Sequence, residues 1–203
     1  AMMSTSNTIE MKREEAKMEI SVFELRLKVY TLVDINLKEV LSAEAEYIDS
    51  AFALDDEWLR FHENNEYKNY TFSGLYPLAK DSIYQKDNVY TITIRTVDSR
   101  VEQYMRKTLA NHHTDKMKGL TITSRIIPKK FINQVYTLTP VIQKYDGGYW
   151  KKAVSLDEYE KRLFANAVKK YNAFTGEKID EDFQLYNEIS SVSYTHLTLP
   201  TKL

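Results

Sequence analysis

Cysteine is absent from this sequence, which excludes disulfides and thiolate metal sites. The chain is also poor in residues that break regular structure, because four prolines and five glycines leave little room for long flexible linkers. No run approaches the ~18 apolar residues of a membrane span, and we recognise no signal peptide. With 203 residues, of which 43% are hydrophobic, the sequence predicts a soluble cytoplasmic protein of one large or two small domains.

The net charge of -1 hides an uneven distribution of charge along the chain. Residues 37 to 66 contain nine acidic and two basic residues, whereas residues 101 to 152 contain ten basic and three acidic ones. Such a basic half is compatible with a face that attracts phosphates, although solvated helix and strand faces often have the same composition. Charge alone therefore does not separate these two interpretations.

The first half of the chain begins with a strand pattern followed by a helix pattern. Residues 20 to 33 alternate apolar and polar positions, with Arg26 and Lys28 on the side that faces water or a ligand. Asn36 then predicts the N-cap of a helix, which continues towards Tyr47.

Three further strands are predicted at residues 70 to 76, 89 to 96 and 118 to 127. Between the last two, Asp98 or Ser99 predicts the cap of a second helix. The order strand, helix, strand, strand, helix, strand is that of a ferredoxin-like βαββαβ unit, an α+β fold. We therefore predict a first ferredoxin-like domain over residues 18 to 130.

The same pattern restarts after this domain. A strand is predicted at residues 135 to 145, a turn at 146 to 148, and a helix from Leu156 that Ser155 and Glu158 cap and Gly176 ends. Only one more strand-like piece follows, at residues 183 to 189. The prediction is thus a tandem of ferredoxin-like domains, of which the second, residues 131 to 189, is incomplete.

Both ends of the sequence differ in character from the rest. Residues 1 to 17 are polar without apolar periodicity, which predicts a non-native or disordered leader before Met18. The closing VSYTHLTLPTKL resembles a translated sequencing-library adapter, so residues 190 to 203 are interpreted as an artefactual tail. On that interpretation the chain is truncated at its C-terminus.

One stretch, from Tyr47 to Ser73, holds a tyrosine, a histidine and a lysine that suit RNA cleavage. Tyr47 and His62 would lie about 22 Å apart on one straight helix, at about 1.5 Å per residue. Asp55, followed by two acidic residues, predicts an N-cap and a second helix beginning at Trp58. The resulting hairpin would let Tyr47 and His62 meet, with Lys68 on the following loop.

Attack of a ribose 2′-hydroxyl on its own phosphodiester needs a base, an acid for the 5′-oxygen, and a cation for the charge on phosphorus. Tyr47, His62 and Lys68 supply such groups without a metal. The alternative from spacing alone is a core tyrosine and a solvated lysine, as is usual for these residue types.

Three segments carry a resemblance to a known family: LRFHENNEYKNYTFSGLYP at residues 59 to 77, IPKKF and VYTLTPVI at 127 to 142, and YEKRL with KKYNAFTGEKIDEDFQLY at 159 to 186. In these segments the chain resembles the CRISPR-associated repeat-cleaving endoribonucleases, the Cas-six family. The resemblance covers roughly residues 18 to 189. It implies tandem ferredoxin-like domains and cleavage of precursor CRISPR RNA within its repeats.

The resemblance also implies roles for single residues. His62 and Tyr47 would share the base and acid roles, and Lys68 would stabilise the pentacoordinate phosphate. The reaction would need neither metal nor cofactor and would leave a 2′,3′-cyclic phosphate. The implied partners are CRISPR repeat RNA and other CRISPR-associated proteins, with a homodimer as a further option. RNA phosphates are expected to pair with seven basic residues: Arg26, Lys28, Lys129, Lys130, Lys144, Lys151 and Lys152.

Three other interpretations are less well supported. His112, His113 and Asp115 resemble a metal cluster, but adjacent histidines point apart, which favours a polar loop. A base-stacking RNA-recognition module lacks its paired-aromatic strand. A purely structural interaction protein leaves the basic half unexplained. The strongest rival is a non-catalytic CRISPR RNA-binding relative of the same fold, in which His62 is incidental.

Overall fold

The computed structural model describes residues 20–64, 67–132, 143, 145–146, 148 and 150–179. The chain divides into two compact units, Ala1–Val141 and Ile142–Leu203, and each is considered by itself. Several predictions lie outside the described residues: the leader at 1 to 17, most of the strand at 135 to 145, the strand-like piece at 183 to 189 and the tail at 190 to 203. The predicted domain boundary at 130/131 stays a prediction.

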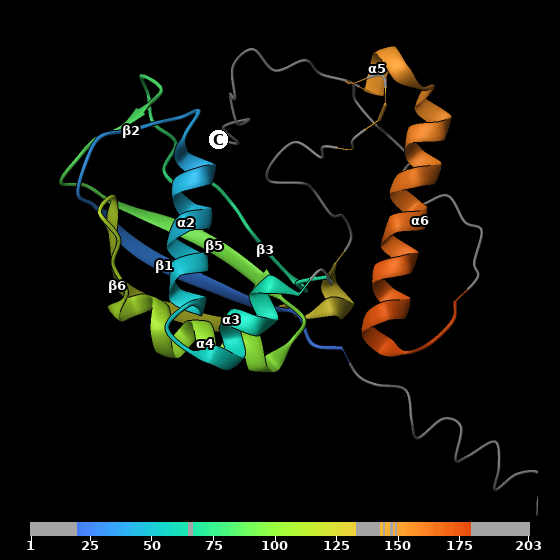
Figure 1. Cartoon of the computed structure of the whole chain (residues 1–203), viewed down its shortest axis with the longest axis horizontal. Helices are drawn as coiled ribbons and strands as arrows, with labels where there is room; N and C mark the ends of the chain where they lie inside the picture. Colours follow the sequence, from blue (N-terminus) through green and yellow to red (C-terminus); the bar gives the residue numbers. More distant parts are fainter. Residues whose placement is uncertain are drawn as a thin grey trace, which may run out of the picture. The chain divides into compact units, whose positions relative to one another are not determined.

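The first unit is built on a four-stranded antiparallel sheet in the order β3-β5-β1-β6 (Figure 1). Its strands are β1 (Phe23–Thr31), β3 (Tyr70–Phe72), β5 (Val89–Thr96) and β6 (Met117–Ile126). Helices α2 (Val40–Phe52) and α3 (Asp56–Glu63) follow β1, and helix α4 (Ser99–Thr108) with the 3-10 turn η1 (Leu109–Asn111) precedes β6. The predicted α+β class with an antiparallel sheet is confirmed, and a two-stranded β2 (Ile35–Asn36) and β4 (Ile83–Tyr84) pair stands beside it.

The core lies between this sheet and its helices. In β1 the side chains of Leu25, Leu27 and Val29 are completely buried, whereas Arg26 and Lys28 are exposed on the opposite face. Alternation with a period of two residues puts the apolar set on one side of the sheet and the cations on the other. Figure 1 shows α2 crossing in front of β1 and β5, on the side that the apolar set faces.

A bend between α2 and α3 forms where the sequence predicts it. The carboxylate of Asp55 accepts hydrogen bonds from the backbone N–H groups of Glu57, at 2.9 Å, and Trp58, at 3.3 Å. These two donors have no partner within α3, so the cap stabilises the start of the helix. Asp98 caps α4 in the same way, accepting from the N–H of Arg100 at 2.9 Å.

The start of α2 differs from the prediction. Asn36 belongs to the short strand β2 rather than to a helix cap, and α2 begins at Val40 after a turn. The side chain of Asn36 accepts from the N–H of Lys38 at 3.0 Å, a local turn bond that asparagine forms readily outside helices.

The described part of the second unit contains α5 (Trp150–Ala153) and α6 (Leu156–Thr175). Helix α6 is capped as predicted, because the Ser155 hydroxyl accepts from the N–H of Glu158 at 3.2 Å and Gly176 ends the helix with a φ of 73°. That left-handed conformation costs glycine little. Helix α5 was not predicted; the ring of its first residue, Trp150, stacks on Tyr159 at 4.4 Å.

Candidate functional site

The bend at Asp55 places His62 of α3 against the outer side of α2. The Nδ1 atom of His62 lies 3.6 Å from a carboxylate oxygen of Asp49. This separation is too long for a good hydrogen bond. The imidazole also stacks on the buried ring of Phe52 at 6.1 Å. Its side chain nevertheless remains 31% exposed, so His62 is both oriented and accessible.

Lys68 closes the C-terminal end of α3. Its ammonium group donates to the backbone oxygens of Phe61 at 2.7 Å, His62 at 2.5 Å and Asn64 at 2.5 Å. Carbonyls at a helix C-terminus carry partial negative charge and lack intrahelical donors, so a lysine stabilises them. All three N–H donors of Lys68 are therefore used in this conformation.

Two residues that the sequence analysis did not single out complete this cluster. Burial raises the pKa of the Asp49 carboxyl, and the positive charges of His62 and Lys68 oppose that rise. Burial also raises the pKa of Tyr70 to about 12, with a further contribution from the charge of Asp49. The structure therefore brings four ionisable groups together, which we call the α3 cluster: Asp49, His62, Lys68 and Tyr70.

Tyr47 does not belong to the α3 cluster. Its side chain is completely buried, and its hydroxyl shares one proton between the backbone oxygens of Leu109, at 2.6 Å, and His112, at 3.0 Å. Burial raises the pKa of this phenol well above its ordinary value. Tyr47 and Asp49 are two positions apart, which is about 200° around a helix. The bend therefore brings His62 and Lys68 together but leaves the Tyr47 hydroxyl in separate surroundings.

His112 lies beside Tyr47 rather than in a purely polar loop. One of its ring nitrogens is 2.8 Å from the Ser50 hydroxyl, and its ring meets the Tyr47 ring edge-on at 5.0 Å. Burial, with the neighbouring His113, lowers the pKa of His112. Among the residues that the structure describes, no three potential ligands gather as a metal site.

The predicted RNA-binding cations fall into separate groups. Arg26 and Lys28 are exposed on the sheet face opposite the core, and Lys129 and Lys130 are exposed in the 3-10 turn η2 (Lys129–Phe131). Lys151 and Lys152 are exposed in α5 of the second unit, whereas Lys144 lies outside the described residues.

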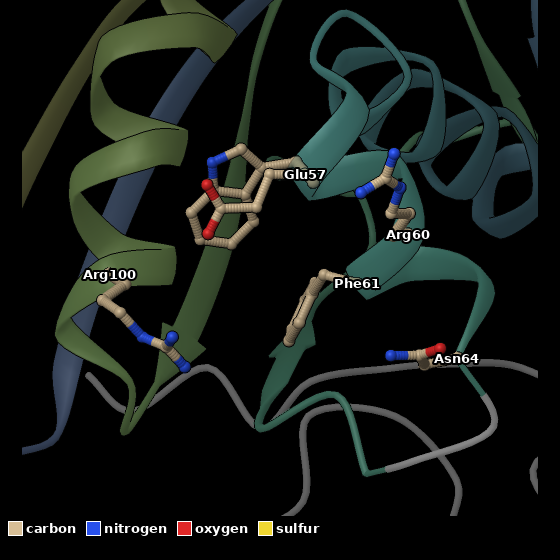
Figure 2. Close-up of a pocket in the computed structure, with 6 residues that line it drawn as sticks. Glu57, Arg60, Phe61, Asn64 and Arg100 are labelled. Atoms are coloured by element: carbon tan, nitrogen blue, oxygen red, sulfur yellow. The ribbon is translucent and has the colours of Figure 1, made fainter.

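A shallow hollow of about 230 Å³ lies between α3 and the start of α4. Figure 2 shows Arg100 on the α4 side, Arg60 and Phe61 on α3, and Asn64 where the chain leaves α3. Aromatic rings and guanidinium groups are the groups that contact single-stranded nucleotides. However, the Arg100 guanidinium is held by the Asp98 carboxylate at 3.0 Å, so part of its charge is already neutralised.

Neither a comparison with protein-family models nor one with curated proteins finds a match for this chain. A search of solved structures finds a similar fold in a chain titled "CRISPR associated protein Cas6". The two share 17% sequence identity with a TM-score of 0.50, over 78% of this chain and 74% of that one. At this identity the likeness concerns the fold alone. In the described part of the chain, no helix has both the length and the apolar character needed to cross a bilayer.

Proposed function

We propose that this protein binds CRISPR repeat RNA and cleaves it at the α3 cluster without a metal ion. The observation that carries the proposal is the position of His62, which α3 holds beside Asp49 and which remains accessible within a fold similar to that of a Cas6 structure. In this proposal the fold is a tandem of ferredoxin-like domains, and the second unit is the beginning of the second domain.

The proposed reaction is an attack of a ribose 2′-hydroxyl on the adjacent phosphorus, which releases the 5′-oxygen and leaves a 2′,3′-cyclic phosphate. His62 accepts the proton of the 2′-hydroxyl, and the nearby Asp49 carboxylate stabilises the imidazolium that forms. Tyr70, neutral at physiological pH, donates a proton to the leaving oxygen. Tyr47 was expected to share this work with His62; its buried hydroxyl instead supports the backbone of η1.

Lys68 contributes positive charge beside the reacting phosphate. In the free protein its ammonium group is satisfied by three carbonyls of the α3 end. A phosphate oxygen replaces one of these acceptors when RNA binds, and an ion-paired hydrogen bond is stronger than one to a neutral carbonyl. The cost of the exchange is small because the helix end keeps two of its three bonds.

RNA is held in this proposal by basic residues of both units, through phosphates rather than bases. The contacts on the first unit come from Arg26, Lys28, Lys129 and Lys130, and those on the second from Lys144, Lys151 and Lys152. Other CRISPR-associated proteins and a second copy of the chain are further partners to be tested by co-purification and by measurement of the molecular mass in solution.

A non-catalytic RNA-binding protein of the same fold is the second candidate. It is favoured by the structure of the α3 end, where Lys68 has a complete structural role, and by the burial of Tyr47. In this alternative the α3 cluster only stabilises the helical hairpin, and RNA binds without being cut.

The test uses a labelled CRISPR repeat RNA incubated with the protein in EDTA. We expect cleavage in EDTA and none when the nucleotide before the cut carries a 2′-deoxyribose, because the nucleophile is then missing. His62→Ala is expected to bind the RNA and leave it intact. Cleavage that survives either change would refute the mechanism, and binding without cleavage by the wild type would establish the non-catalytic alternative.

A further inference from the structure

The face of the sheet that points away from the core carries a buried carboxylate among arginines. Glu24 of β1 points to the same side as the exposed Arg26, yet its side chain is only 3% exposed. Two neighbouring side chains cover it. Arg95 donates to one carboxylate oxygen from Nε at 3.1 Å and Nη2 at 2.9 Å, and Arg125 donates to the other from Nε at 3.0 Å and Nη2 at 2.7 Å.

The strand register explains this arrangement. Glu24 lies directly opposite Arg95 on β5 and opposite Arg125 on β6, so one carboxylate meets a guanidinium from each neighbouring strand. Arg26, two residues further along the same face, places its Nε 3.5 Å from Glu24. Burial alone would raise the pKa of Glu24, but the hydrogen bonds from Arg125 and Arg95 outweigh it and the pKa is lowered. Glu24 is therefore ionised and fully paired.

One carboxylate does not neutralise this face. Arg26, Lys28, Arg95 and Arg125 leave it with an excess of positive charge over Glu24. The side chains of Arg26 and Arg125 are 60% and 64% exposed, and that of Arg95 is 40% exposed. A guanidinium has five N–H donors, so Arg95 and Arg125 each keep three after bonding to Glu24. Threonines lie between the cations on β5 and β6 at positions 91, 93, 121 and 123.

This arginine group is close to the α3 cluster along the edge of the sheet. Arg95 pairs with Thr71 on the edge strand β3, and Lys68 is three residues before Thr71. With about 3.3 Å per extended residue and about 4.8 Å between strands, the backbones of Arg95 and Lys68 are at most about 15 Å apart. A short run of nucleotides spans that distance around the end of β3.

We propose that Glu24 is a positioning residue, which holds the guanidinium groups of Arg95 and Arg125 ready to bind phosphates of single-stranded RNA that leads to the α3 cluster. The inference rests on the proposed function for the identity of its ligand. Long arginine side chains lose conformational freedom on binding, and a carboxylate that fixes them beforehand removes part of that cost. Glu24 touches no RNA itself and acts through the two arginines.

If these residues act only through their charge, Glu24→Gln should change RNA affinity in the opposite direction. Replacing Glu24 by glutamine removes a negative charge from a phosphate-binding face, so a simple charge count makes RNA binding tighter. If Glu24 positions the arginines, Glu24→Gln weakens binding by roughly tenfold, the cost of immobilising two rotamer-rich side chains. Glu46→Gln is the matched control, because Glu46 lies on α2 and pairs at 2.6 Å with Lys116, just before β6, rather than with the arginines of this face.

The experiment measures the dissociation constant for a labelled single-stranded repeat RNA over a salt series, in the His62→Ala background so that the RNA stays intact. We expect Arg95→Ala and Arg125→Ala each to reduce the slope of log affinity against log salt by about 0.7, as for one lost phosphate contact to a single strand. Glu24→Gln should weaken binding, and it should have no further effect once both arginines are replaced, because it acts through them. Glu24→Gln binding as tightly as Glu46→Gln would overturn the inference.

A charge-conserving pair of substitutions keeps the test valid should Glu24→Gln fail to fold. Arg95→Lys with Arg125→Lys retains the net charge but loses the planar donor fork that serves carboxylate and phosphate at once. We expect weaker RNA binding from this variant, and unchanged binding would contradict the inference. If the protein binds polyglutamate as tightly as RNA, the ligand of this face is an acidic protein rather than RNA, and the inference is overturned. Failure of the unmodified protein to bind RNA would refute the proposed function as well, whereas wild-type binding with an unaffected Glu24→Gln refutes only this inference.

Discussion

Glutamate and tyrosine side chains have different surroundings in the core beneath α2 and on the surfaces of the first unit. Glu24 and Glu44 are both hidden from solvent, but Glu24 is paired with arginines, whereas neither oxygen of Glu44 has a hydrogen-bond partner among the described residues. Tyr47 is locked to backbone oxygens in the core, whereas Tyr70 is only partly buried beside Asp49. Polar groups beneath α2 therefore affect stability, and those outside it remain available for chemistry and binding.

The largest effect that we expect is on the cleavage rate, when the accessible His62 is replaced. His62→Ala should lower the single-turnover rate by about 10²- to 10⁴-fold, the usual contribution of one proton-transfer group. The free energy of unfolding should fall by only about 1 kcal/mol, because the imidazole stacks on Phe52 but makes no close hydrogen bond. His113→Ala, an exposed histidine outside the α3 cluster, is the control and should leave the rate unchanged. A rate for His62→Ala within threefold of wild type would remove the α3 cluster from the mechanism.

Glu44 should make stability depend on pH, because burial raises its pKa to about 9. The folded state then holds a proton that the unfolded state releases near the ordinary value of 4.5. The free energy of unfolding is therefore unaffected below pH 4.5, and it falls by about 1.4 kcal/mol for each pH unit between 4.5 and the folded-state pKa. Urea unfolding of the wild type between pH 5 and 9 should show this decline.

Glu44→Gln should abolish the decline, since glutamine does not titrate. Parallel curves for the two proteins would show that Glu44 is ionised or solvated in the fold. Glu24 behaves in the opposite sense, because its pKa is lowered: its stabilising contribution is present above the unfolded pKa and is lost as pH falls through the folded one. The two buried carboxylates thus act in separate pH ranges.

The sequence predicts the strands and the Asp55 bend well, because both depend on local signals. Alternation with a period of two fixes which side of β1 faces the core, and an aspartate before acidic residues is a strong N-cap. The buried face of α2 is not evident from local periodicity: the apolar Leu41 is 45% exposed, whereas Glu44 and Tyr47 are completely buried. The face of α2 is decided by packing against the sheet, which local periodicity does not encode when a glutamate occupies the core stripe.

Only the part of the candidate site that depends on local sequence was predicted. His62 and Lys68 come together because both belong to one helix end, which is a local relation. Tyr47 was assigned from the expected hairpin and from the family resemblance, and a shift of two positions around a helix moves a side chain to the opposite side. Asp49 belongs to no motif and Tyr70 was predicted only as part of a strand, so only the packing of α2, α3 and β3 shows that both belong to the cluster.

Tyr47→Phe should separate a structural phenol from a catalytic one. Removing the hydroxyl leaves the backbone oxygens of Leu109 and His112 without this donor, which should cost about 1 to 2 kcal/mol of unfolding free energy. Cleavage at saturating protein should stay within a few-fold of wild type. A rate loss of 10²-fold or more in a folded Tyr47→Phe protein would mean that the phenol leaves the core when RNA binds.

The smallest effect should come from Asp49→Asn, which tests whether the outer side of α2 supports His62. Asp49 is 42% exposed and 3.6 Å from the imidazole, so its charge is partly screened and we expect roughly a tenfold loss of single-turnover rate. RNA affinity should be unchanged or slightly higher, because a negative charge near the phosphates is removed. Combining Asp49→Asn with His62→Ala should give no further loss, since the carboxylate acts through the imidazole. An additive loss in the double variant would instead make Asp49 an independent contributor to the reaction.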